Sequence, residues 1–85
     1  MSKELLSFII VGDENSIQKA AEKLNLSSPP VCKRIKKLEF QLGIKLFQRK
    51  NKRMELTEEG YKLYKKATSI HQDIVNLYEN YKNDL

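Results

Sequence analysis

The 85-residue sequence contains one cysteine, Cys32, one histidine, His71, and no tryptophan. A single cysteine cannot form a disulfide within the chain, which fits a reducing compartment. Because Cys32 and His71 lie far apart, they give no basis for a zinc site or for a Cys–His catalytic pair. We therefore expect no metal, no cofactor and no enzymatic activity.

The sequence also lacks any apolar run of membrane-spanning length, and its N-terminus does not have the pattern of a secretory signal. With three glycines and two prolines, it has few breaks, and no repeat or low-complexity linker divides it. We expect one small domain in the cytoplasm of a bacterium. A domain with a core of this size is only modestly stable alone, so pairing with a second chain is expected to increase its stability.

Positive charge is concentrated in the middle of the chain. Residues 16–53 carry eleven Lys and Arg against two carboxylates, a net charge of +9, whereas residues 1–15 and 54–85 each carry −2. A basic surface of this kind either binds a polyanion or only keeps the protein soluble, and its location on a structural motif favours the polyanion.

That motif is a helix, a tight turn and a second helix within residues 16–39. Turn and cap residues at 25–28 interrupt a helical apolar pattern, and Pro29 and Pro30 fit only the first turn of the helix that follows. Ser27 and Ser28 are alternative N-caps for it, and Gly43 is expected to stop it. The residues predicted to face inward are Ile17, Ala20, Ala21 and Leu24, then Val31, Ile35, Leu38 and Leu42.

Further elements are predicted on both sides of this motif. Before it, an apolar run over 5–11 is read as a helix capped by Ser2 and ended by Gly12. After it, residues 44–56 predict a short β-hairpin wing whose turn is basic. Thr57 is then the expected N-cap of a long final helix. The predicted fold is mainly α, with a winged helix-turn-helix over 1–57 and a linker and dimerisation helix over 58–85.

The final helix carries an apolar seam at heptad spacing. One small domain cannot cover about seven helical turns, so a second copy of the chain is expected to pack on the seam. Tyr61, Tyr64, Tyr78 and Tyr81 are expected to pack there rather than stack on bases. The predicted seam residues are Leu63, Ala67, Ile70, Ile74, Leu77 and Tyr81.

A helix-turn-helix with a basic wing predicts binding to double-stranded DNA, the second helix in the major groove and the wing in the minor groove. Arg34 lies nearer the edge and is expected to contact phosphate or form an ion pair. The alternative is a winged-helix module whose long helix binds a partner protein. The candidate DNA-binding residues are Ser27, Ser28, Pro29, Pro30, Cys32, Lys33, Lys36, Arg49, Lys50, Lys52 and Arg53.

In order and spacing, several segments resemble the N-terminal DNA-binding domain of LysR-type transcriptional regulators. They are NSI (15–17), AAEKL (20–24), LSSPPVCKRI (26–35), LE (38–39), LGI (42–44), LFQR (46–49) and LTEEG (56–60). The resemblance implies a homodimer on an interrupted palindrome in promoter DNA at the nucleoid, with RNA polymerase as a further partner. It places base reading on Ser28, Pro29, Cys32 and Lys33, a phosphate contact on Ser27, and the minor-groove contact on Arg53.

Three positions depart from the family pattern. Ser28 replaces the usual glutamine, Cys32 the usual serine, and Lys33 a common arginine, so the target bases are expected to differ. The chain also has no segment that could form the family's effector-binding domain. It is therefore expected to be either an excised DNA-binding domain or a natural short relative that works without an inducer.

Overall fold

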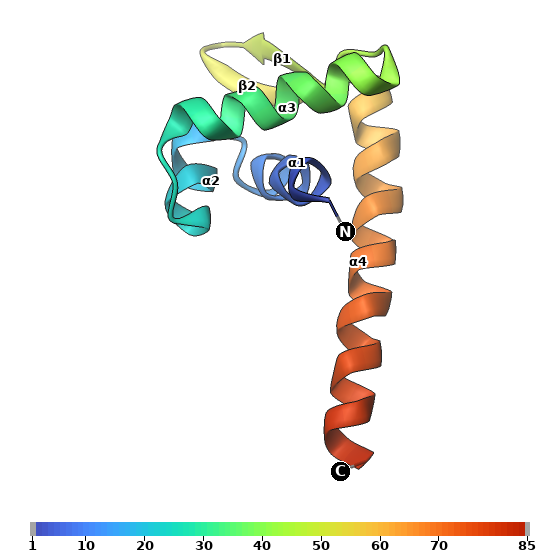
Figure 1. The fold of residues 1–85 in the computed structure, drawn as a ribbon. Coiled ribbons are helices and arrows are strands. Elements are labelled where there is room, and N and C mark those ends of the chain that lie inside the picture. Colours follow the sequence, from blue (N-terminus) through green and yellow to red (C-terminus); the bar gives the residue numbers. More distant parts are fainter. Residues whose placement is uncertain (1, 85) are drawn as a thin grey trace.

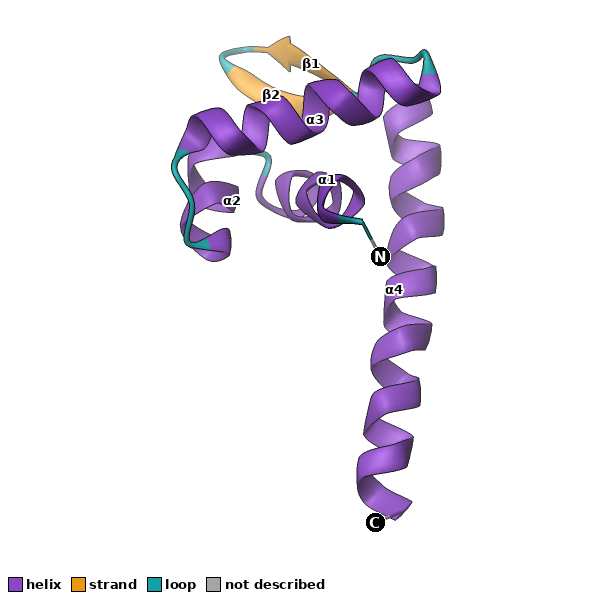
Figure 2. Cartoon of the chain, in the orientation of Figure 1, coloured by secondary structure: helices purple, strands orange, loops and turns teal. Residues whose placement is uncertain are grey.

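The computed structural model describes residues 2–84, with side chains from Ser2 to Lys82. This part of the chain contains four helices and one antiparallel hairpin, which confirms the predicted winged helix-turn-helix with a long final helix (Figures 1 and 2). The elements are α1 (Lys3–Glu14), α2 (Ile17–Leu24), α3 (Ser28–Leu42), β1 (Phe47–Lys50), β2 (Arg53–Leu56) and α4 (Glu58–Asp84). Across the described chain, every helix falls short, in length or in apolar character, of what crossing a membrane requires.

Helix α1 begins as predicted but ends later. The Ser2 hydroxyl accepts a hydrogen bond from the Leu5 N–H at 3.1 Å, which caps the first turn. The prediction that Gly12 ends the helix is wrong, because α1 continues to Glu14 and is capped by Asn15 in the left-handed region, at φ 53°. Gly12 instead permits close packing, since a Cβ there would lie 2.7 Å from Cδ2 of Tyr64 on α4.

The turn between α2 and α3 is closed by backbone hydrogen bonds. Asn25, at φ 58°, donates its N–H to the carbonyls at the end of α2, and the Leu26 N–H returns to the Ala21 carbonyl at 2.9 Å. This is the bonding of a left-handed helix cap. Ser27 is the N-cap of α3, with prolines in its first turn, so the choice between the two serines is settled.

The core lies where α1, α2 and α3 meet. Phe8, Val11 and Val31 are fully buried, and Ala20 lets α2 approach its neighbours closely because its side chain is short. The predicted inward face of α3 is confirmed for Val31, Ile35 and Leu38. It is wrong for Leu42, the last residue of α3 before the Gly43 cap, which is 47% exposed.

Thr57 joins the hairpin to α4. Its hydroxyl accepts a hydrogen bond from the Gly60 N–H at 2.9 Å, which confirms the predicted N-cap, and donates to the Lys45 carbonyl at 2.6 Å. Gly60 is buried at this junction, where its Cα faces the Leu46 backbone. The first turn of α4 is therefore fixed against the chain segment that enters the hairpin.

The first half of α4 packs on its own domain. Tyr64 donates its hydroxyl to the Asp13 carboxylate, which together with partial burial raises the pKa of Tyr64 to about 12. Its ring meets Phe8 edge-on, with centroids 6.4 Å apart. The predictions that Tyr64 and Ala67 contact a partner chain are corrected here, because both pack inside the protomer and Ala67 is 2% exposed. Beyond them α4 extends away from the domain (Figure 1).

We expect Gly60→Ala to destabilise the domain more than Gly43→Ala. A Cβ on Gly60 would lie 2.1 Å from the Leu46 carbonyl oxygen, and such overpacking costs about 3 kcal/mol. Gly43, at φ 69°, has open space around it, so alanine there adds only backbone strain of about 1–2 kcal/mol. Thermal unfolding followed by circular dichroism measures both, and equal melting temperatures would contradict the close approach at Gly60.

Candidate nucleic-acid interface

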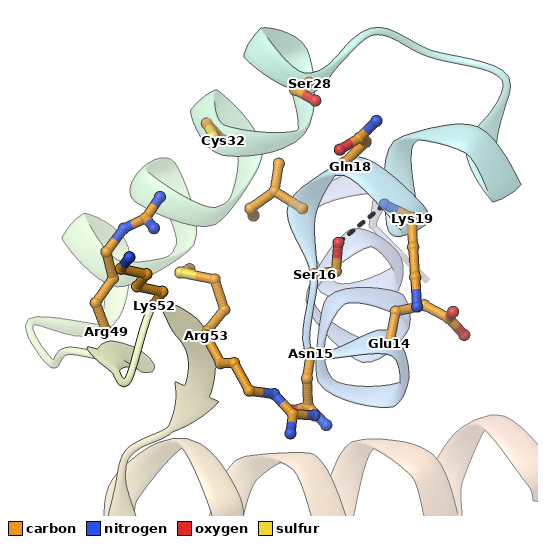
Figure 3. A pocket seen from close by; sticks show the side chains of 12 residues that line it. Glu14, Asn15, Ser16, Gln18, Lys19, Ser28, Cys32, Arg49, Lys52 and Arg53 are labelled. Carbon is orange, nitrogen blue, oxygen red and sulfur yellow. Dashed lines mark hydrogen bonds between the residues drawn. The ribbon is translucent and has the colours of Figure 1, made fainter.

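An open cleft of about 620 Å³ lies between the start of α2, the first turns of α3 and the hairpin (Figure 3). Residues 14–19 form one wall, and Ser28 and Cys32 of α3 form another. Arg49 and residues 52–54 of the hairpin close the third side. The beginning of a helix and the tip of a hairpin therefore open onto the same hollow.

Five of the predicted DNA-binding residues meet in this cleft. They are Ser28, Cys32, Arg49, Lys52 and Arg53. Figure 3 shows Arg53 extending along the cleft toward Asn15, whereas Arg49 and Lys52 lie nearer to α3. The sequence alone placed these residues in two separate elements, and the fold brings them together.

The turn of the hairpin places three basic side chains at its tip. Asn51 and Lys52 both have positive φ, 54° and 65°, and Lys50 pairs with Arg53 across the turn. Two left-handed residues between paired strands form the type I′ turn, whose twist matches that of a hairpin. The side chains of Lys50, Lys52 and Arg53 are all exposed at this tip.

The remaining predicted residues of α3 do not share the cleft. Pro29, Lys33 and Lys36 are exposed on its outer face, and Ser27 makes no side-chain cap bond. Because successive residues turn by about 100°, Lys33 projects to the side of Cys32 that faces away from the hairpin. Pro30 and Lys33 line a separate hollow beside α1.

Arg34 has a structural contact that the sequence did not indicate. Its Nη1 donates to the hydroxyl of Ser7 at 3.3 Å, and Ser7 is fully buried in α1. In the described residues Arg34 forms no ion pair. Of the two contacts expected for Arg34, the ion pair is thus absent from the described part of the chain, and the phosphate contact stays a prediction, while a hydrogen bond ties α3 to α1.

Sequence reasoning missed the wall formed by the start of α2. Asn15, Ser16, Gln18 and Lys19 line the cleft opposite the hairpin. The Ser16 hydroxyl accepts the Lys19 N–H at 3.1 Å, so this serine is occupied as a cap. The sequence did contain a signal for this wall, because the capping Ser16 is followed by Gln18 and Lys19. Polar residues at the start of a helix commonly contact phosphates.

The cleft is strongly positive. Lys19, Arg49, Lys52 and Arg53 face a single carboxylate, Glu14. Lys23 forms an ion pair with Glu14 at 2.9 Å, and its hydrogen bond to that carboxylate raises the pKa of Lys23. The one acidic side chain on the rim is therefore neutralised from outside the cleft.

Glu39 holds the hairpin against α3. Its Oε2 accepts hydrogen bonds from the backbone N–H groups of Leu46, at 2.7 Å, and Phe47, at 3.4 Å. Leu46 and Phe47 are buried, and the Phe47 ring packs edge-on against Phe8 with centroids 5.5 Å apart. The position of the basic tip relative to α3 thus depends on the partly buried carboxylate of Glu39.

This arrangement of three helices and a wing defines a winged helix-turn-helix. Residues 2–61 match the model of the bacterial regulatory helix-turn-helix proteins of the lysR family. The chain belongs to this family, which is a family of regulators and not of enzymes.

Relatives of known sequence and structure agree with this membership. The chain is 38% identical over 72 residues to the uncharacterized regulator YgfI of Escherichia coli, and 42% identical over 69 residues to the regulator BsdA of Bacillus subtilis. These matches cover 85% and 80% of the chain but only 24% of each relative, so the chain spans about a quarter of their length.

Two solved structures show the likeness in three dimensions. BenM_DBD in complex with catB site 1 DNA has a TM-score of 0.87 and 32% identity, over 96% of this chain and 89% of that one. CbnR_DBD in complex with DNA has a TM-score of 0.83 and 27% identity, over 99% and 98%.

We expect Glu39→Ala to destabilise the protein by about 1–3 kcal/mol, because it leaves the buried N–H groups of the hairpin without an acceptor. Glu39→Gln, which keeps one acceptor oxygen, should lose less. Glu22→Ala on the exposed face of α2 is the matched control. Chemical denaturation measures all three, and a Glu39→Ala variant as stable as the control would show that the carboxylate does not hold the hairpin.

Proposed function

We propose that this chain binds double-stranded DNA and forms the sequence-reading part of a transcriptional regulator. The shared cleft carries the proposal, because the start of α3 and the basic hairpin tip face one hollow. A helix end and a hairpin so arranged fit neighbouring grooves of a single duplex. The DNA complexes of BenM_DBD and CbnR_DBD, whose folds this chain shares, support the same function.

In this proposal α3 enters the major groove with its exposed face. Ser28, Pro29, Cys32, Lys33 and Lys36 contact the bases, while Pro30 sits at the groove wall. Lysine can donate to guanine O6 and N7, and small side chains suit contact with a thymine methyl group. Because Ser28 and Cys32 are short, Lys33 carries most of the sequence discrimination.

The hairpin and the helix starts contact the DNA backbone. Arg53 turns from its place beside Asn15 into the minor groove, where the negative potential favours arginine. Lys52 accompanies Arg53 in the minor groove, and Arg49 and Lys50 contact phosphates, as does the Ser27 hydroxyl, which makes no cap bond. These contacts fix the register of α3 on the duplex without reading bases.

We further propose that α4 pairs two copies of the chain. Ile70, Ile74, Leu77 and Tyr81 are 47%, 37%, 56% and 68% exposed, and they recur on one side of the helix. A stripe of this kind is costly to leave in water. Pairing on it gives two α3 helices related by symmetry, which suits an interrupted palindrome. Control of nearby genes, contact with RNA polymerase and a place at the nucleoid remain predictions for the whole regulator.

We expect Lys33→Ala and Lys50→Ala to weaken DNA binding in different ways. A duplex selected from a random pool and its scrambled version serve as probes, with fluorescence anisotropy as the readout. Lys33→Ala should reduce the preference for the selected duplex, because a base contact is lost. Lys50→Ala should lower the affinity for both duplexes alike. Equal effects of the two variants on both duplexes would contradict these roles.

The same titration tests the function itself. With about four to six phosphate contacts per subunit, log affinity should fall with log salt at a slope of about −4 to −5 per subunit. Affinity for duplex DNA that barely changes between about 50 and 200 mM salt would overturn the proposal and favour a protein-binding module instead.

We expect Leu77→Lys to convert a dimer to monomers, because a charge in the apolar stripe must be buried on pairing. Gln72→Lys adds the same charge on the opposite, polar side of α4 and is the control. Light scattering gives the oligomeric state. Dimers that survive Leu77→Lys, or a native chain that is monomeric at every concentration, would contradict pairing through this stripe.

A further inference from the structure

A second basic surface lies on the side of α3 that faces away from the hairpin. A hollow of about 270 Å³ is lined there by Lys3, Glu4, Pro30, Lys33, Arg34 and Lys37. Lys3 and Glu4 come from the first turn of α1, and the other residues come from α3. Figure 1 shows α3 between the hairpin on one side and α1 on the other, so this surface and the hairpin cleft flank the same helix.

The charges on this flank are unevenly paired. Lys37 forms an ion pair with Glu4 at 2.9 Å, and Arg34 is held by Ser7. Within the described residues neither Lys3 nor Lys33 is paired with a carboxylate. The hollow thus carries four cations against one carboxylate, whose side chain is only 17% exposed beneath Lys37.

The dimensions of DNA indicate what this flank meets. A helix with its side chains is about 10–12 Å wide, and the major groove is about 12 Å wide. A helix placed in the groove therefore has a phosphate backbone along each side. The hairpin supplies cations toward one backbone, and the α1 flank supplies them toward the other.

We propose that Lys3 and Lys37 form a second phosphate-binding site, which contacts the strand bounding the major groove on the side opposite the wing. Glu4 occupies Lys37 in the free protein, and a phosphate replaces it in the complex. This inference rests on the proposed DNA-binding function and adds a contact surface from α1 to it.

Replacing each charge separately tests the proposal. Lys3→Ala should lower the affinity for the selected duplex and for the scrambled duplex equally, by several-fold. It should also reduce the slope of log affinity against log salt by about 0.9. Lys37→Ala should weaken them more, because it also leaves the Glu4 charge uncovered. Glu4→Gln should strengthen binding, because it frees Lys37 for phosphate.

The control is Lys82→Ala, which removes the same charge from the far end of α4, well beyond the screening length from this flank. Melting temperatures by circular dichroism verify that each variant is folded. The expected order of affinity is Glu4→Gln, native, Lys3→Ala and then Lys37→Ala, with Lys82→Ala equal to native.

The outcomes separate this site from the proposed function. If Lys50→Ala lowers the salt slope while Lys3→Ala and Lys37→Ala match Lys82→Ala, the chain binds DNA and the second site is wrong. A Glu4→Gln variant that binds no tighter than native overturns the exchange of carboxylate for phosphate. If the native chain shows no steep salt dependence, the DNA-binding function itself is wrong.

Discussion

The carboxylate of Glu39 connects the two parts of the interface, and the rest of its geometry depends on that connection. Two strands of four residues each are too short to be stable alone. Glu39 accepts hydrogen bonds from the backbone N–H groups of Leu46 and Phe47, where the hairpin begins. Thr57, which follows the last strand, donates a hydrogen bond to the carbonyl of Lys45, just before the first strand. Both attachments lie at the base of the hairpin, so the basic tip is positioned by α3 and α4 while its own side chains stay free.

The core and the interface are two faces of the same helix. Because an α-helix completes one turn every 3.6 residues, the spacing that buries Val31 and Ile35 also places Lys33 and Lys36 on the solvent-exposed side of α3. A substitution that rotated the helix would therefore disturb packing and binding together.

Much of the fold could be predicted from the sequence, because periodicity and cap residues are local signals. The burial of Val31 and Ile35 and the cap at Thr57 followed from them. The prediction for Gly12 was wrong, because a glycine near the end of an apolar run predicts the end of a helix. Only the packing of α4 against α1 shows that Gly12 makes room for Tyr64. Tyr64 was assigned to a partner for the same reason: its contact with Asp13 joins residues far apart in the sequence.

The candidate site was predicted as a set of residues but not as a surface. Spacing identified the cations of α3 and the hairpin, yet it could not show that Lys19 joins them or that Lys33 lies on another flank. Each flank also contains one carboxylate, Glu14 or Glu4, and a lysine covers each of them. In both ion pairs the lysine is 61% exposed, whereas the Glu14 and Glu4 side chains are only 21% and 17% exposed. The carboxylate of each flank therefore lies close to the lysine that pairs with it, and the residues lining each flank keep a net positive charge.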